Sequence, residues 1–201
     1  FTRAYDFGFS KSTKEALQKW NYDSVLADVV WVIRNFKPDV IITRFPGDSR
    51  AGHGHHSASS VLANEAFAAA ADANKFPWQL SNGVTTWQAK RILWNTFNFG
   101  SGTNTTSEDQ FKINVGVFNP VIGQGYGEIA SESRSQHKSQ GFGVPRQRGD
   151  SYEYFTTTGG TTPTNDLLDQ VNTTWGRITN SKRIQQSIDN IIQQYNFNNP
   201  A

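Results

Sequence analysis

The chain has 201 residues, enough for one sizeable α/β domain, and its 36% hydrophobic and 13% aromatic content is sufficient for a buried core. Nineteen basic against 17 acidic side chains give a net charge near +2, and no basic stripe alternates with aromatic residues, so we expect no nucleic acid as a partner. No apolar run approaches the roughly 18 residues of a membrane span, and the absence of cysteine excludes disulfides and thiolate-bound zinc.

The first 74 residues predict an alternation of helices with a strand. Ser12, followed by Glu15 three residues later, is a helix-capping pattern. Apolar residues then recur at helical spacing, and Lys37-Pro38 ends this second helix. A β-branched run that follows predicts a strand. After a loop that contains histidines, an alanine-rich stretch predicts a third helix. This order is typical of a doubly wound α/β sheet with mostly parallel strands. The predicted elements are helices over 12–20, 23–36 and 57–74 and a strand over 39–43.

The rest of the chain predicts further strands separated by polar loops, and two more helices. The last helix is amphipathic, with four isoleucines on one face. We see no internal repeat and no domain boundary, so the sequence predicts one α/β domain. The predicted elements are strands over 90–95, 111–117 and 151–155, helices over 125–140 and 181–195, and loops over 99–109, 141–150 and 156–166.

Three of the four histidines lie within four positions, in the loop "DSRAGHGHHS" that begins at Asp48. In an open α/β sheet, ligands bind beyond the carboxyl ends of the strands, where this loop is expected. His53 and His56 are three positions apart, so in a helical turn they point to one side, and one imidazole can bind a metal while the other meets the substrate. The alternative is a glycine-rich surface loop whose histidines cap a helix.

Two segments carry a resemblance to a known family. The stretch "KPDVIITRFPGDSRAGHGHHSASSVLANEAF" (37–67) resembles the second conserved block of the LmbE-like, PIG-L-type zinc deacetylases, in which a strand leads to an acidic loop, an HxxH motif and an alanine-rich helix. The stretch "GEIASESRSQHKSQGFG" (127–143) is similar to the His-x-Ser-Gln helix of the long-chain bacterial branch. Segments 3–20 and 175–195 are also similar to this family, so the resemblance covers nearly all of the chain.

The resemblance implies a Rossmann-like, three-layer α/β deacetylase domain over residues 1–201. Such a domain removes the N-acetyl group from an N-acetylglucosamine-type sugar or a related N-acyl substrate, and one zinc ion holds the attacking water. By the motif match, His56 is the zinc ligand, and His53 stabilises the oxyanion and protonates the leaving amine. The other implied site residues are Asp6 and His137 at the substrate, and Asp48 and His55, which would orient a metal-binding histidine.

Each of these further residues also has a simpler interpretation. Asp6 and Asp48 are both typical of turns, in which the carboxylate accepts a backbone N–H two residues on. His55 is equally consistent with an exposed position, and His137 with a solvated helix face.

The sequence departs from the family in one respect. The family's first block, a His-Pro-Asp-Asp turn that supplies two zinc ligands and the general base, does not occur. Catalytic zinc normally takes three protein ligands, so we expect this chain by itself to be inactive. Since Phe1-Thr-Arg is not a native start, we expect the first strand and the first metal motif in an N-terminal segment of a longer parent, with which this chain would associate.

Two other functions stay open at this stage. The missing block also fits a non-catalytic carbohydrate-binding or structural module with a decayed metal site. An esterase, or a hydrolase of a different N-acyl substrate, keeps the metal and changes the reaction. By analogy with the long-chain branch, we expect a bacterial protein that is periplasmic or secreted.

Overall fold

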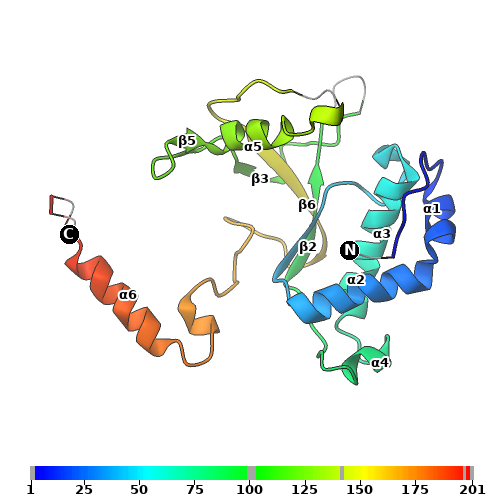
Figure 1. The fold of residues 1–201 in the computed structure, drawn as a ribbon, viewed down its shortest axis with the longest axis horizontal. Helices are drawn as coiled ribbons and strands as arrows, with labels where there is room; N and C mark the ends of the chain where they lie inside the picture. Colours follow the sequence, from blue (N-terminus) through cyan, green and yellow to red (C-terminus); the bar gives the residue numbers. More distant parts are fainter. Residues whose placement is uncertain (1–2, 99–102, 141–142, 197, 200–201) are drawn as a thin grey trace.

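A mixed sheet with helices on one side forms the body of the protein. The computed structural model describes residues 3–98, 103–140, 143–196 and 198–199. The four strands lie in the order β1 (Val40–Thr43), β2 (Arg91–Thr96), β6 (Tyr152–Gly160) and β3 (Phe111–Asn114). The helices α1 (Thr13–Trp20), α2 (Tyr22–Phe36) and α3 (Gly54–Ala69) lie together on one side of this sheet (Figure 1). The prediction of an α/β fold is therefore confirmed at the level of a mixed α/β domain.

The strand directions differ from the sequence expectation. β1 and β2 run parallel, whereas β6 pairs antiparallel with both β2 and β3. A mostly parallel sheet was therefore the wrong expectation for the described strands. Strand propensity depends on how side chains fit a pleated surface, and it does not specify the direction in which a later strand returns to the sheet.

The core between α2 and α3 follows from the apolar spacing of the sequence. The apolar stripe of α2 packs on the alanine-rich face of α3, whose small side chains allow the two helices to approach closely. Ile41 of β1 packs against the same cluster, so β1 directs this side chain towards the helices. The buried members of the cluster are Val25, Leu26, Val30, Ile33, Leu62, Ala66, Ala69 and Ala70.

One charged side chain in this core determines where α3 ends. Arg34 is fully buried, and its guanidinium donates to the carbonyl oxygens of Ala69 and Ala70 at the end of α3. A helix leaves its last carbonyls without intrahelical partners, and a cation at this end is stabilised by the helix dipole. Burial lowers the pKa of Arg34 below its ordinary value. The predicted helix over 57–74 thus ends earlier than the sequence suggests.

The start of α3 is fixed by α1. Ser12 caps α1 by accepting the backbone N–H of Glu15 at 3.2 Å, as the capping pattern predicts. The backbone N–H of Gly54 donates to the Ser10 carbonyl oxygen at 3.1 Å, and a Cβ on Gly54 would lie 2.2 Å from the carbonyl oxygen of Ser12. α3 therefore begins at Gly54, three residues before the predicted start, and only glycine fits there.

A smaller substructure stands beyond the end of the sheet. It contains the short hairpin β4 (Phe118–Asn119) and β5 (Gln124–Gly125) and the helix α5 (Tyr126–Arg134). Glu128 closes the start of α5 by accepting the Gly125 N–H at 3.0 Å. The predicted helix over 125–140 is thus divided, because α5 ends at Arg134 and a 3₁₀ turn, η2 (Lys138–Gln140), follows.

The last strand is longer than predicted. Thr156 and Thr157 pair with Trp94 and Leu93 of β2, and Thr158 is the extra residue where the register shifts. A Cβ on Gly159 would lie 3.1 Å from the Phe67 ring. Threonine favours strands, and glycine allows this close approach, so the part of the predicted loop over 156–160 belongs to β6.

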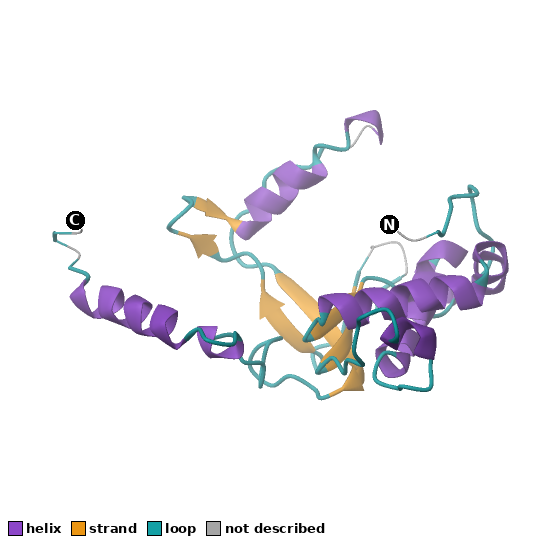
Figure 2. Cartoon of the chain, turned by 60° about the horizontal axis from the view of Figure 1, so that its bottom comes forward, coloured by secondary structure: helices purple, strands orange, loops and turns teal. Residues whose placement is uncertain are grey.

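The helix α6 (Lys182–Gln194) ends the fold, and α4 (Pro77–Leu80) is a single turn between α3 and β2. Figures 1 and 2 agree in placing α6 far from α1–α3, with the sheet between them. Among the described residues, none of the helices combines the length and the apolar character that crossing a bilayer requires.

Candidate functional site

The histidine loop connects β1 to α3, at the carboxyl end of a parallel strand. It includes the 3₁₀ turn η1 (Ser49–Ala51), whose cap is Asp48. The Asp48 carboxylate accepts the backbone N–H of Arg50 at 2.9 Å and forms an ion pair with its guanidinium at 2.7 Å. Hydrogen bonding by Arg50 lowers the pKa of Asp48 below its ordinary value. Asp48 thus closes a turn, which is the simpler of the two interpretations. Within the described chain, its carboxylate has no hydrogen bond to a histidine.

His56 is held in one orientation by two contacts. Its ring stacks on Phe45 with centroids 3.8 Å apart and an interplanar angle of 9°. Its Nδ1 lies 3.1 Å from the carbonyl oxygen of Ala51. A carbonyl oxygen only accepts, so Nδ1 carries the proton and donates it, and Nε2 keeps a free lone pair. This is the arrangement in which a histidine binds a metal through Nε2.

His53 lies beside His56 at the start of α3. The two rings have centroids 5.1 Å apart, as the three-residue spacing predicts. His53 takes the extended N-cap position of α3, and its exposed ring lies edge-on to Phe9 at 4.7 Å. His53 and Asp48 also line one small cleft of about 170 Å³ with residues from the start of α1. A group held at the His53 ring is therefore open to solvent and within reach of His56.

His55 has different surroundings. Its ring lies between Phe7 and Trp20, with centroids at 4.3 and 5.0 Å, and its Nδ1 is 2.8 Å from the hydroxyl oxygen of Ser10. The same hydroxyl accepts the backbone N–H of His55 at 2.7 Å. Its buried Nε2 has no hydrogen-bond partner among the described residues. His55 thus anchors the N-terminal segment to α3 and is not fully exposed, and its role in orienting a metal-binding histidine stays a prediction.

The two residues predicted at the substrate lie in simpler environments. The Asp6 carboxylate accepts the backbone N–H of Gly8 at 3.0 Å, which closes the turn that the sequence already allowed. His137 follows α5 and is exposed. No ring contact or hydrogen bond within the described residues joins His137 to the histidine loop. Their roles at a substrate stay predictions.

The sequence reasoning missed the residues that fix the histidines. Phe45 and Phe9 contact the His56 and His53 rings, and the carbonyl of Ala51 fixes the tautomer of His56. The only signal was that Phe45 is the second residue after the predicted strand, on the loop that leads to the histidines. A backbone carbonyl has no sequence signature.

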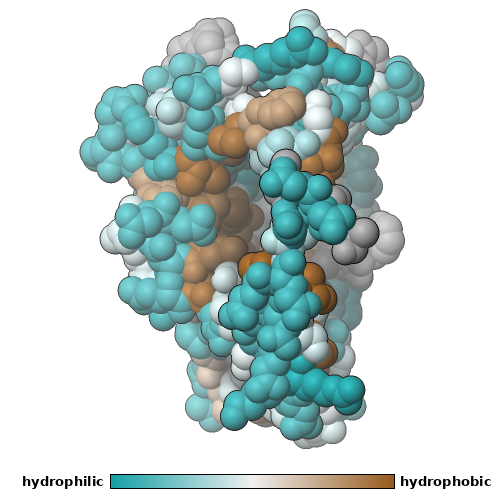
Figure 3. Space-filling view, turned by 90° about the vertical axis from the view of Figure 1, so that its left-hand side faces the viewer, coloured by the Kyte–Doolittle hydropathy of each residue, from teal (hydrophilic) through white to brown (hydrophobic). Residues whose placement is uncertain are grey.

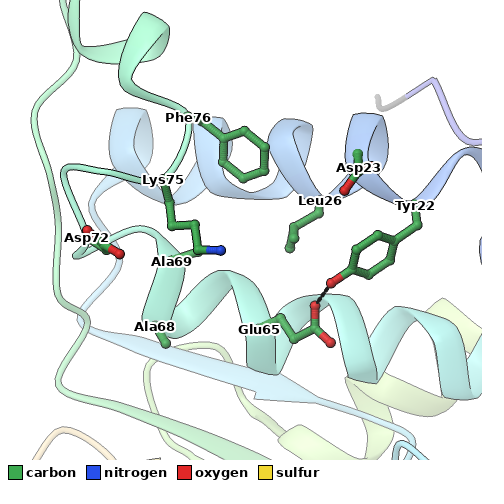
Figure 4. Close-up of a pocket in the computed structure, with 9 residues that line it drawn as sticks. All are labelled: Tyr22, Asp23, Leu26, Glu65, Ala68, Ala69, Asp72, Lys75 and Phe76. Carbon is green, nitrogen blue, oxygen red and sulfur yellow. Dashed lines mark hydrogen bonds between the residues drawn. The ribbon is translucent and has the colours of Figure 1, made fainter.

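A larger cavity lies away from the histidines. It has a volume of about 470 Å³ and lies between α2 and α3 (Figure 4). Tyr22 donates a hydrogen bond to the Glu65 carboxylate at its edge. This hydrogen bond raises the pKa of Tyr22 to about 12, because ionisation removes the proton that Tyr22 donates; burial and the negative charge of Glu65 add to the rise. The walls combine carboxylates with apolar side chains, and no residue of the histidine loop lines the cavity.

The described residues contain no complete set of metal ligands. Nε2 of His56 has a lone pair that is free to bind a metal, but nowhere in the described chain do three His, Asp or Glu side chains group closely enough to hold a metal ion. Catalytic zinc takes three protein ligands and leaves one position for water. The histidine loop therefore presents two neighbouring imidazoles, and their role at a metal stays a prediction.

Comparison with known proteins does not assign a family. No protein-family model matches the chain, and no curated protein matches it significantly in sequence.

Proposed function

We propose that this chain carries the histidine part of a zinc-dependent hydrolase that removes the N-acetyl group from an N-acetylglucosamine-type sugar or a related N-acyl substrate. The observation that supports this most is the Ala51 carbonyl at 3.1 Å from Nδ1 of His56, which leaves Nε2 as a ligand next to a second, exposed imidazole. The resemblance of residues 37–67 to the HxxH block points to the same pair of histidines.

Under this proposal, the two histidines have different tasks. His56 binds the metal through Nε2, with its ring held by Phe45 and by the Ala51 carbonyl. His53 faces the cleft, where it stabilises the charge that develops on the amide oxygen and gives a proton to the leaving amine. The described residues do not complete the metal site, so further ligands would come from other residues.

The proposal extends to the fold. The order β1, histidine loop, α3 is one βα unit, and β1 pairs parallel with β2, as in a Rossmann-like three-layer domain. Such a domain has further parallel strands and a second helical layer, which would lie outside the described elements.

A second candidate function is a non-catalytic carbohydrate-binding or structural module. The lack of a group of three metal-ligating side chains among the described residues favours it. The two functions differ in whether a polypeptide that contains this chain holds zinc and releases acetate.

The test begins with the coding sequence upstream of Phe1, which the proposal expects to encode a His-Pro-Asp-Asp turn. The polypeptide that includes it should contain about one zinc by elemental analysis and release acetate from N-acetylglucosamine oligomers. His56→Ala should lose the zinc. His53→Ala should keep the zinc and lose activity by roughly 10²–10⁴-fold, the usual contribution of a general acid–base group.

The exposed His137, replaced by Ala, is the matched control for zinc content. A polypeptide that lacks the upstream turn, or that holds zinc equally well with His56→Ala, contradicts the proposal. Zinc bound through His56 without release of acetate from any acetylated sugar removes the deacetylase assignment and leaves the metal site.

A further inference from the structure

The cavity between α2 and α3 has a floor that belongs to the core and walls that carry charge. Leu26 and Ala69 are buried members of the core cluster, whereas Asp23, Glu65 and Lys75 are exposed. The cavity therefore combines an apolar floor with a mouth that is open to solvent. Its volume of about 470 Å³ lies within the roughly 300–1,000 Å³ that is typical of small-molecule sites.

Charges of both signs border this floor and do not neutralise each other. Figure 4 shows Lys75 pointing into the cavity from the turn that follows α3, while Asp23 and Tyr22 come from the start of α2 on the other side. Glu65 lies beside Tyr22, whose hydrogen bond it accepts. Among the described residues, neither the Lys75 ammonium nor the Asp23 carboxylate takes part in an ion pair. One end of the cavity is thus acidic and the other carries a cation.

The wall that carries the cation is fixed from inside the core. The buried guanidinium of Arg34 donates to the backbone carbonyl oxygens of three lining residues, which are Asp72 at 2.8 Å, Lys75 at 2.9 Å and Phe76 at 3.2 Å. Phe76 has a φ of 49°, in the left-handed region that a bulky residue rarely adopts, so the surrounding contacts impose its conformation. The Asp72 carboxylate accepts the backbone N–H of Asn74 at 2.8 Å and is engaged in its own turn. This wall is preorganised, so a ligand does not have to order it.

Exposed apolar side chains alone do not define a ligand. Figure 3 shows one face of the molecule on which apolar side chains lie between polar ones. The cavity between α2 and α3 adds to its apolar floor two carboxylates at one end and an ammonium at the other. This arrangement selects a ligand by the position of its charges as well as by its apolar surface.

We propose that this cavity binds a short peptide with apolar side chains, a free amino group and a free carboxylate. The ammonium of the peptide lies between Asp23 and Glu65, and its carboxylate meets Lys75. Its apolar side chains pack on Leu26 beside the Phe76 ring. The Leu26 side chain lies between the two charged ends (Figure 4), so a dipeptide spans them better than a single amino acid, whose charged groups share one carbon atom.

The charge pattern disfavours simpler ligands. An amine without an anionic group leaves the ammonium of Lys75 unpaired beside it, and an anion without an amine meets two carboxylates. The cavity shares no lining residue with the small cleft at His53, so this proposal is independent of the proposed hydrolase.

The test is a titration of the 201-residue chain with the dipeptide leucyl-leucine, followed by ¹H–¹⁵N NMR. Saturable binding with a Kd on the order of 1 mM is expected, with shifts at the backbone amides of Ala68 and Ala69. N-acetyl-leucyl-leucine lacks the ammonium that two carboxylates share and should bind roughly 10-fold more weakly. Leucyl-leucine amide lacks the carboxylate and should bind roughly 2- to 5-fold more weakly, the usual effect of one exposed ion pair. Glycyl-glycine, which has no apolar side chain, should show no saturable binding.

Variants locate the site. Ala68→Leu places a larger side chain at the mouth and should weaken binding by roughly 10-fold, whereas Ala73→Leu, exposed and outside the lining, is the matched control. Glu65→Gln keeps an acceptor for Tyr22, removes the charge and should weaken binding roughly 2- to 5-fold. Lys75→Gln should weaken leucyl-leucine to the same degree and leave the binding of leucyl-leucine amide unchanged. Circular dichroism verifies that each variant is folded.

Three results would overturn the proposal. The first is a titration without saturable binding of leucyl-leucine. The second is binding that Ala68→Leu leaves unchanged, which places the peptide elsewhere on the molecule. The third is leucyl-leucine amide bound as tightly as leucyl-leucine, which contradicts the role of Lys75 and assigns the cavity to an organic amine.

Discussion

The buried Arg34 provides the sharpest stability prediction. Its guanidinium is fully buried and donates to six oxygen atoms around the end of α3 and the segment that follows. Arg34→Met keeps a long side chain in the core and removes all of these donors. We expect a large loss of stability, because the oxygen atoms that accept from Arg34 stay buried in the variant and gain no hydrogen bond from water in its place.

The magnitude depends on which acceptors keep another donor. Four of the carbonyl oxygens also accept a backbone N–H, and so lose one of two hydrogen bonds; they belong to Ala69, Ala70, Asp72 and Phe76. Among the described residues, the Lys75 carbonyl oxygen and Oε1 of Gln79 have only Arg34 as donor. Each unsatisfied buried acceptor costs about 1–3 kcal/mol, so the variant should lose about 2–6 kcal/mol.

Urea unfolding followed by circular dichroism measures this loss. A loss of about 4 kcal/mol corresponds to a fall in melting temperature of roughly 8–16 °C for a domain of this size. The control is Arg3→Met, which removes an ion pair with Asp28 from a side chain that is 62% exposed and should therefore cost much less stability. If Arg34→Met costs no more than Arg3→Met, the guanidinium does not hold the end of α3.

Three further predictions follow from the structure. Gly54→Ala places a Cβ 2.2 Å from the Ser12 carbonyl oxygen and should lower the melting temperature strongly. At the control position Gly143, an added Cβ meets no atom within 4 Å, so Gly143→Ala should leave the melting temperature nearly unchanged. Equal effects of the two substitutions would contradict the close approach of α1 and α3. Hydrogen bonds from the backbone N–H groups of Asn165 and Thr164 lower the pKa of Asp169 to about 2. In the unfolded chain this pKa is about 3.9. The stability that the carboxylate provides is therefore fully present above about pH 3.9 and is lost as the pH falls to about 2. Asp169→Asn should therefore melt below wild type at neutral pH, and the difference should vanish towards pH 2; a difference that is constant with pH would refute this. Tyr22 should ionise with a pKa of about 12 in the absorbance difference from Tyr22→Phe, and Glu65→Ala should lower this value, since it removes the acceptor that raises it; no change would show that Glu65 is not the cause.

The elements that depend on local pattern could be predicted from the sequence. The cap at Ser12 and the apolar spacing of 23–36 lead directly to α1 and α2, because both signals are contained within one or two turns of helix. The βα unit around the histidine loop was predicted for the same reason, as was the proximity of His53 and His56.

The remaining features depend on contacts between segments that are far apart in the chain. The ends of α3 are set by Gly54 against Ser12 and by Arg34 on α2, and neither contact changes the local pattern of the alanine-rich stretch. The threonine–glycine stretch at 156–160 has the composition of a loop and becomes a strand because β2 lies beside it. The environment of His55 between Phe7 and Trp20 was likewise invisible in the sequence.

The most direct test of the account is the state of the His56 ring, observed through its nitrogen resonances by ¹⁵N NMR. The account predicts that His56 carries its proton on Nδ1, bound to the Ala51 carbonyl. In the polypeptide that includes the upstream His-Pro-Asp-Asp turn, added zinc should shift the Nε2 resonance of His56 and leave the ring of the exposed His137 unaffected. His56 protonated on Nε2, or His56 and His137 that respond equally to zinc, would contradict His56 as a metal ligand and with it the proposed hydrolase site.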